Sequence, residues 1–103
     1  MNDKALSFLG LAARAGELKS GDDTVLKTVQ TKKAQLVIVA GDASANTIKK
    51  FTDKTSFYSC PFRVAGTKAD LGAAIGKESR TILSVTERGF AKKLIKLIDE
   101  EIN

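Results

Sequence analysis

The sequence contains no histidine, one cysteine and one proline in 103 residues. Without histidine, the chain lacks the side chain that most often serves as a general acid or base near neutral pH. Zinc is bound mainly by cysteine and histidine, so a zinc site has almost nothing to build on. The lone Cys60 cannot form an internal disulfide, which is typical of a cytoplasmic protein. We therefore expect no metal, no cofactor and no enzymatic activity.

Long hydrophobic runs are also missing. No stretch of about eighteen apolar residues is present, and residues 1–4 lead directly into a short amphipathic segment. We expect neither export nor membrane insertion, and hence a cytoplasmic location. Apolar residues make up 43% and charged residues 28% of the chain, which is typical of a folded protein. At this length we expect one domain, residues 1–103, with a modest core.

The chain has instead an excess of positive charge. Seventeen lysines and arginines stand against twelve acids, which gives a net charge of +5. Such an excess favours polyanions, nucleic acids among them, although many small basic proteins bind none. The positive charge therefore makes a nucleic acid a candidate ligand, but charge alone does not establish that the chain binds one.

The most informative stretch is the apolar run at residues 36–40 (LVIVA). It does not alternate with polar residues, which predicts a strand covered on both faces, as in an α/β sheet. Gly41 and Asp42 end this strand, and Ser44 is a suitable N-cap for a following helix. Ligands of open α/β sheets lie at the carboxyl ends of strands, so the segment 41–44 is one candidate wall of a site.

Periodicity and turn residues predict the other elements of the chain. Ser20 with Asp23, and Thr67 with Asp70, fit capping boxes that begin helices. The alternation of elements predicts an α/β domain of about four strands with helices on both faces. Helices are expected over residues 5–15, 21–33, 45–57, 71–75 and 88–101, and strands over 17–20, 36–40, 62–64 and 81–85.

The loop at residues 19–24 joins an expected strand to a helix N-terminus, which presents free backbone N–H groups to an anion. Asp23 and Lys27 lie one turn apart on that helix. A carboxylate accepts from base amino or imino groups, and an ammonium donates to guanine or phosphate, so the pair suits base edges. The alternative is that Asp22 and Asp23 only cap the helix and complement its dipole.

Other polar and aromatic features have plain structural explanations. Asp42 would suit a phosphoacceptor or metal ligand, but no second acid lies nearby in the sequence, which favours a capping or turn role. Phe57 and Tyr58 are interpreted as core and rim, because the aromatic signature of an RNA-recognition motif is absent. Residues 77–80 form a charged loop, either solvated surface or part of a site. The remaining lysines are interpreted as solvated helix faces: Lys49, Lys50, Lys54, Lys92, Lys93 and Lys96.

Four segments, taken in order, resemble a known family. They are residues 21–27 (GDDTVLK), 36–44 (LVIVAGDAS), 71–77 (LGAAIGK) and 88–91 (RGFA). Together they resemble the kink-turn-binding ribosomal proteins of the archaeal and eukaryotic seven-Ae and thirty-e type, and most of all the bacterial YlxQ-type branch. The resemblance extends from residue 6 to residue 98. It implies a three-layer α/β/α sandwich with a mixed sheet, and binding to RNA at kink-turns.

The resemblance also implies roles for individual residues. In that family the strand-to-helix loop carries the pattern Gly-x-Asn-Glu-x-x-Lys, whose side chains read sheared G·A pairs. Gly21 and Lys27 match this pattern, whereas Asp23 stands at the Asn position and Thr24 at the Glu position. The loop 77–80 would pack on a flipped-out nucleotide. The residues expected to bind RNA are Lys19, Ser20, Gly21, Asp22, Asp23, Thr24, Lys27, Ser44, Lys77, Glu78, Ser79 and Arg80.

Two of these residues depart from the family pattern. Asp23 cannot donate a hydrogen bond as Asn does, and it brings negative charge close to phosphates. Thr24 lacks the carboxylate that would accept the guanine N1 and N2 protons, although Asp23 could take over that role. These departures predict weaker binding to a standard kink-turn, or binding to another RNA.

We therefore expect a monomeric, ribosomal-protein-like chain that binds structured RNA and no membrane. The alternative is a protein-interaction module of the same fold that has lost specific RNA reading, as Asp23 and Thr24 would allow. A small enzyme acting near Asp42 is a further alternative. The lack of histidine, the single cysteine and the lack of a carboxylate pair argue against it.

Overall fold

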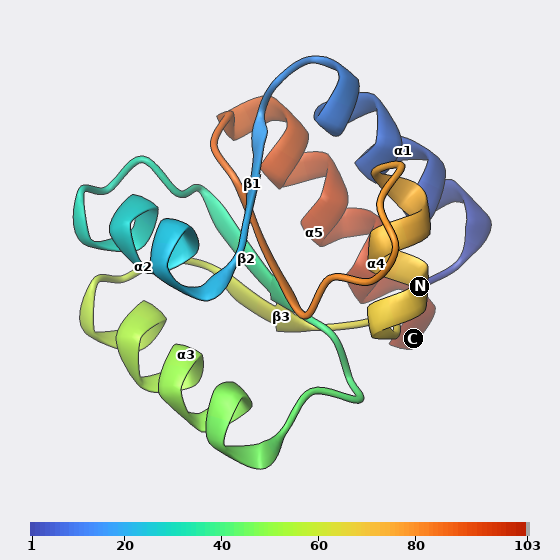
Figure 1. Ribbon diagram of the computed structural model, residues 1–103. Helices are drawn as coiled ribbons and strands as arrows, with labels where there is room; N and C mark the ends of the chain where they lie inside the picture. The colour runs from blue at the N-terminus through green and yellow to red at the C-terminus, as the bar shows by residue number, and fades with distance from the viewer. Residues whose placement is uncertain (103) are drawn as a thin grey trace.

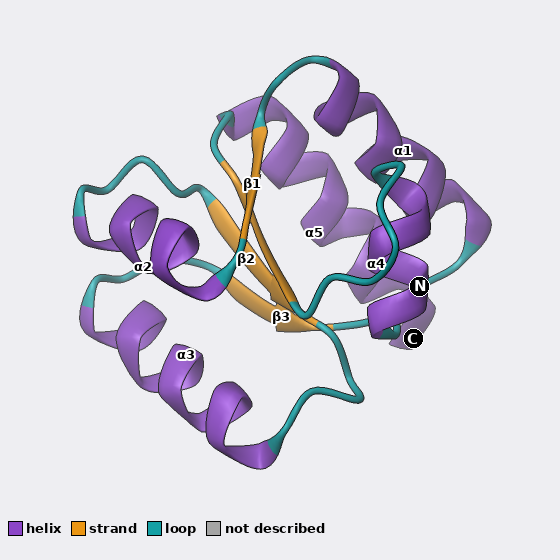
Figure 2. Cartoon of the chain, in the orientation of Figure 1, coloured by secondary structure: helices purple, strands orange, loops and turns teal. Residues whose placement is uncertain are grey.

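The computed structural model describes residues 1–102 as helices and strands that alternate along the chain (Figures 1 and 2). The predicted α/β class and the predicted four strands are confirmed. The helices are α1 (Asp3–Arg14), α2 (Asp22–Gln30), α3 (Ala45–Phe57), α4 (Lys68–Ala74) and α5 (Arg88–Ile102). The strands are β1 (Leu18–Ser20), β2 (Leu36–Val39), β3 (Phe62–Val64) and β4 (Ile82–Val85).

The four strands form one mixed sheet in the order β1-β4-β2-β3. Strand β4 lies between β1 and β2 and is antiparallel to both, whereas β2 and β3 are parallel. The loops that follow β1, β2 and β3 therefore leave the sheet at the edge where β4 begins. This edge positions the candidate site.

Helices cover both faces of the sheet, with α1, α4 and α5 on one face and α2 and α3 on the other (Figure 2). Strand β2 is fully buried between these layers, as the apolar run predicts. Its alternating side chains supply both cores, because successive residues of a strand point to opposite faces. Leu36 and Ile38 join the cluster on the α1, α4 and α5 side, and Val37 and Val39 join the cluster with α2 and α3.

Side-chain caps begin several of the helices. The Ser44 hydroxyl oxygen accepts from the backbone N–H of Thr47 (3.1 Å), which confirms its N-cap role. Thr67 accepts in the same way from Asp70 (3.0 Å). The carboxylate of Glu87 accepts from the N–H groups of Phe90 (2.7 Å) and Gly89 (2.8 Å), and these hydrogen bonds lower the pKa of Glu87.

The capping box predicted at Ser20 and Asp23 is wrong. Ser20 belongs to β1 and pairs with Leu83, so it cannot also adopt the position of an N-cap. Gly21 takes that position with φ +96°, and α2 has no side-chain cap among the described residues. Helix α2 also ends earlier than predicted, because the N–H groups of residues 33 and 34 both donate to the carbonyl of Thr28 and turn the chain toward β2.

The surface of the described chain agrees in part with the sequence. The lysines of α3 and α5 that were predicted to face solvent are exposed. The prediction that Phe57 lies in the core is wrong, because this residue is 79% exposed. Its ring lies edge-on to that of the half-buried Tyr58, with the ring centroids 4.9 Å apart. Among residues 1–102, no helix is long and apolar enough to cross a bilayer.

Candidate nucleic-acid interface

The chain before β4 lies at the edge of the sheet where β1 and β2 end. Ser20 at the end of β1 pairs with Leu83, and the N–H of Ala40 after β2 donates to the carbonyl of Thr81 (2.8 Å). The chain before β4 therefore lies between the chain that leaves β1 and the chain that leaves β2. The predicted stretches 19–27 and 77–80, far apart in the sequence, converge on this edge.

The start of α2 is open to solvent. Residues 21–24 are all exposed, and the backbone at Gly21 has the left-handed φ of +96° that glycine adopts without strain. No side chain among residues 1–101 caps the first turn of α2, so its N–H groups remain available to an anion. Asp22 and Asp23 in that turn complement the helix dipole, and their charge opposes an approaching phosphate.

Lys27 lies one turn beyond Asp23 on α2, as predicted, and both side chains are exposed. Within the described part of the chain no ion pair joins them. Both side chains are therefore free to contact a ligand at the start of the helix.

The loop 77–80 is held against α4 by backbone hydrogen bonds. The N–H of Lys77 donates to the carbonyl of Gly72 (2.8 Å), and the N–H of Arg80 donates to the carbonyl of Lys68 (3.0 Å). The guanidinium of Arg80 donates to the carbonyl of Ser79 (2.7 Å) within the loop. Lys77, Glu78 and Ser79 are exposed. The loop thus has a fixed backbone and projects polar side chains to solvent.

One groove joins the two predicted stretches. It has a volume of about 180 Å³ and includes Lys19 and Ser20 from β1 and Lys77 from the loop before β4. Its apolar wall comes from Leu18, Ile75 and Leu83, with Ala13 of α1 at one side. The structure therefore places two lysines and a hydroxyl around a small apolar surface at this edge.

Ser44 and Asp42 have structural partners outside this groove. The hydroxyl of Ser44 caps α3, and it does not line the groove. The carboxylate of Asp42 accepts from the backbone N–H of Lys68 (2.8 Å) at the start of α4, which confirms the predicted capping role. This contact ties the end of β2 to the helix that carries the loop 77–80.

One basic residue that lies beside the site could not be predicted from the local sequence. Arg14, in the last turn of α1, lines an adjoining groove of about 300 Å³ with Ile75 and Gly76. A basic residue at that position is also the usual partner of the helix dipole, so nothing local singles it out. Its place beside Gly76, next to the loop 77–80, follows only from the packing of α1 against α4.

These features define the class: a small α/β/α sandwich that gathers exposed loops and several basic side chains at one edge of a mixed sheet. The chain belongs to the Ribosomal protein L7Ae/L30e/S12e/Gadd45 family, whose sequence model matches residues 3–95. The resemblance predicted from the four segments is therefore confirmed.

Individual relatives are similar over nearly the whole chain. It is 48% identical over 92 residues to "RNA-binding protein YlxQ" of Bacillus subtilis strain 168, covering 89% of this chain and 92% of that protein. It is 27% identical over 99 residues to "Large ribosomal subunit protein eL8" of Thermoplasma volcanium, covering 95% and 82%.

Solved structures share the same arrangement of elements. A protein of unknown function from Bacillus halodurans C matches with a TM-score of 0.93 and 46% identity, over 95% of this chain and 99% of that one. The "Giardia lamblia 15.5kD RNA binding protein" matches with a TM-score of 0.79 over 97% and 92%, at 22% identity, a level that shows the fold alone.

Proposed function

We propose that this protein is a non-enzymatic, monomeric, cytoplasmic RNA-binding protein that recognises a kink-turn or a similarly bent, structured RNA. Binding would use residues 19–27, with the N-terminus of α2, and the loop 77–80. The family, and the RNA-binding name of the Bacillus subtilis relative, support the ligand class.

One observation carries the proposal: the two stretches meet at a single groove although they are far apart in the sequence. Lys19, Ser20 and Lys77 line it together. Bent or internally looped RNA is recognised through its shape and a few unstacked bases rather than through a regular groove. An edge that combines lysines with a small apolar wall suits a phosphate backbone beside an unstacked base.

Some of the charged side chains at this edge favour RNA binding and others oppose it. Lys19, Lys27, Lys77 and Arg80 would contact phosphates, together with the open N–H groups at the start of α2. Asp22 and Asp23 oppose this attraction. A standard kink-turn should therefore be bound more weakly than by a chain with the family pattern, unless the carboxylate of Asp23 accepts from the amino or imino group of a guanine.

The test compares a kink-turn RNA with the same RNA after replacement of its G·A pairs, at two salt concentrations. We expect tighter binding to the intact kink-turn at both salts, because base contacts survive screening better than phosphate contacts. Equal affinity for the two RNAs, with only a salt effect, would leave a non-specific basic protein. A lack of RNA binding, with a stable protein partner, would favour the interaction module that Asp23 and Thr24 allow.

A further inference from the structure

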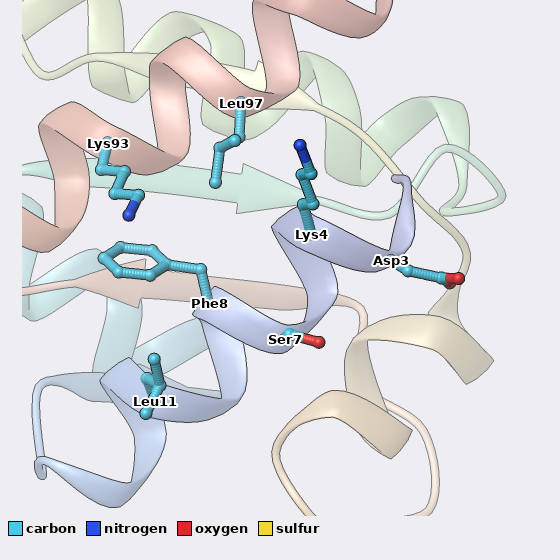
Figure 3. Close-up of a pocket in the computed structure, with 7 residues that line it drawn as sticks. All are labelled: Asp3, Lys4, Ser7, Phe8, Leu11, Lys93 and Leu97. Carbon is cyan, nitrogen blue, oxygen red and sulfur yellow. The ribbon is translucent and has the colours of Figure 1, made fainter.

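Another groove lies between α1 and α5, on the helical layer that covers one face of the sheet (Figure 3). Its volume is about 390 Å³. Apolar side chains from both helices form its floor: Phe8 and Leu11 from α1 and Leu97 from α5. The side chain of Leu11 is 48% exposed, and together with Phe8 and Leu97 it forms a contiguous apolar surface, which is the kind of exposed patch that marks an interaction site.

The packing below the groove keeps its shape. The rings of Phe8 and Phe90 lie with their centroids 5.3 Å apart and tilted by 46°. The ammonium of Lys93 lies 4.7 Å from the centroid of the Phe8 ring, at the distance of a cation–π contact. Figure 3 shows Lys93 and Leu97 reaching from α5 toward Phe8 of α1. The groove is thus preformed.

Positive charge surrounds this apolar floor. Lys4 and Lys93 line the groove itself, and a neighbouring depression of about 400 Å³ along α5 shares Lys93 and Leu97 and adds Lys92 and Lys96. Two acids, Asp3 and Glu100, line the same two surfaces. None of the four lysines belongs to an ion pair within the described residues. The four lysines therefore outnumber the two acids, and their positive charge is available to bind an acidic partner.

We propose that the α1–α5 groove (Lys4, Phe8, Leu11, Lys93 and Leu97) docks an acidic amphipathic helix from a partner protein. A helix that lies in a groove places apolar residues at i, i+3, i+4 and i+7 into the floor. Leu11, Phe8 and Leu97 supply that floor. Acidic residues on the flanks of such a helix would face the lysines of α1 and α5, which gives electrostatic complementarity and faster association.

The chemistry of the groove disfavours two other occupants. An RNA base would stack on an open aromatic face, but the Phe8 ring already has Phe90 beside it and Lys93 over it. A second copy of this chain would bring a surface with four lysines and two acids against an identical surface, so the excess of positive charge on each copy would repel that on the other. An acidic helix meets neither obstacle.

The groove is separate from the proposed RNA interface. Lys4, Phe8 and Leu11 lie on the side of α1 that faces α5. Ala13 and Arg14 line the grooves toward α4 and the sheet edge. A ligand in the α1–α5 groove therefore leaves the stretches 19–27 and 77–80 accessible, so failure of either proposal is visible without the other.

The experiment uses the full-length ¹⁵N-labelled chain and designed helical peptides. One group has leucine and phenylalanine along one face and glutamate on the flanks, with several spacings of the apolar residues. One control peptide replaces glutamate by lysine, and another scrambles the acidic sequence so that it has no apolar face. We expect the acidic amphipathic peptides to bind about tenfold or more tightly than either control, with amide shifts confined to residues 3–11 and 89–100.

Two matched pairs of variants locate the binding. Leu11→Glu is paired with Phe57→Glu, because both replace an exposed apolar residue and Phe57 lies on α3. Lys93→Glu is paired with Lys50→Glu, because each lysine lies over a phenylalanine ring, at 4.7 and 5.4 Å from the centroid. The α1 and α5 variants should weaken peptide binding about tenfold, and the α3 variants should leave it unchanged. Circular dichroism and urea unfolding report that each variant remains folded.

Several outcomes would overturn the proposal. These are no binding by any acidic amphipathic peptide, equal binding of the scrambled peptide, or shifts outside the groove. Competition by the RNA with shifts on Phe8 and Leu11 would make the groove a nucleic-acid surface instead. Self-association in sedimentation equilibrium that Leu11→Glu abolishes would assign it to a second copy of the chain.

Discussion

Gly72 in α4 lies directly against the carbonyl of Glu78. A Cβ atom at position 72 would lie 2.3 Å from that oxygen and 2.6 Å from the Cα of Ser79, both far inside ordinary contact distances. The same glycine accepts a hydrogen bond from the N–H of Lys77 (2.8 Å). The absence of a side chain in the middle of a helix therefore lets the loop 77–80 pack on α4.

Replacement of this glycine should destabilise the protein. In Gly72→Ala the added methyl group meets backbone atoms, and overpacking of this kind costs about 1–3 kcal/mol. The change gains about 1 kcal/mol in helix propensity. Because three backbone atoms would lie within 2.6 Å of the new Cβ, we expect the clash to cost more than this gain. Urea unfolding should show a lower midpoint, and amide shifts should change along residues 77–80. The control is Ala73→Ser, at the exposed next position of the same helix. Unchanged stability in Gly72→Ala would mean that the loop moves freely away from α4.

Much of the fold follows from local sequence. The continuous apolar run at residues 36–40 predicts a strand buried on both faces, and β2 is such a strand. The apolar spacing at Phe90, Leu94 and Ile98 predicts α5, and these residues pack in the core next to β2. Ser44 and Thr67 mark the starts of α3 and α4 through their own hydroxyl groups. Each of these signals is contained within a few residues.

The features that the sequence did not predict correctly depend on residues distant in sequence. Ser20 has the residue type of an N-cap, but its pairing with Leu83 in β4 keeps it in a strand. Phe57 has the residue type of the core, yet α3 ends there on a solvent-facing side. The convergence of 19–27 with 77–80 depends on β4 lying between β1 and β2, which local patterns do not reveal. The roles of Asp23, Thr24 and Lys27 toward RNA remain predictions.

The ion pair between Arg63 and Asp99 should make stability depend on acidic pH. Nε and Nη2 of Arg63 on β3 donate to the two carboxylate oxygens of Asp99 on α5, at 2.8 and 3.0 Å. These hydrogen bonds hold the pKa of Asp99 below its ordinary range. A lowered pKa in the folded state gives stabilisation that is fully present above the unfolded-state pKa, about 3.9, and is lost as the pH falls through the folded-state pKa.

The measurement compares the free energy of unfolding of the wild type and Asp99→Asn between pH 7 and pH 2. The wild type should be more stable at neutral pH, and the difference should shrink below about pH 4. Asp53→Asn is the matched control, because Asp53 pairs with Lys49 on the exposed surface of α3, where an ion pair contributes little. A difference that is constant across this range would show that protonation of Asp99 is not linked to folding.

Cys60 should react slowly in the folded protein. The thiol is half-buried, and its burial raises the pKa to about 11. The thiolate is the reactive form, so alkylation by iodoacetamide near pH 7.5 should be on the order of a hundredfold slower than for an ordinary cysteine. The same protein in concentrated guanidinium chloride is the control, because unfolding exposes the thiol. Equal rates in the two conditions would show that Cys60 is solvated in the folded state.

Lys27 should contribute to RNA affinity through a base or phosphate contact. If its ammonium reads a base, Lys27→Ala should weaken binding to the kink-turn by about 1–3 kcal/mol and reduce the preference for intact G·A pairs. If it contacts only a phosphate, the variant should weaken binding to both RNAs alike and reduce the salt dependence. Lys50→Ala, on the exposed side of α3, is the matched control. Unchanged affinity in Lys27→Ala would remove this lysine from the interface.

Substitution of Asp23 tests whether residues 19–27 bind a standard kink-turn or a different RNA. The carboxylate of Asp23 lies in the first turn of α2, where it cannot donate a hydrogen bond and repels phosphate. Asp23→Asn restores the family pattern at this position. It should therefore strengthen binding to a standard kink-turn by about 1 kcal/mol, roughly fivefold. Asp22→Asn removes the same charge one residue earlier and serves as the control, because a gain from charge alone should occur in both variants. A loss of affinity specific to Asp23→Asn would instead show that the carboxylate accepts from a guanine edge, and that the protein recognises its RNA in a different way from the family pattern.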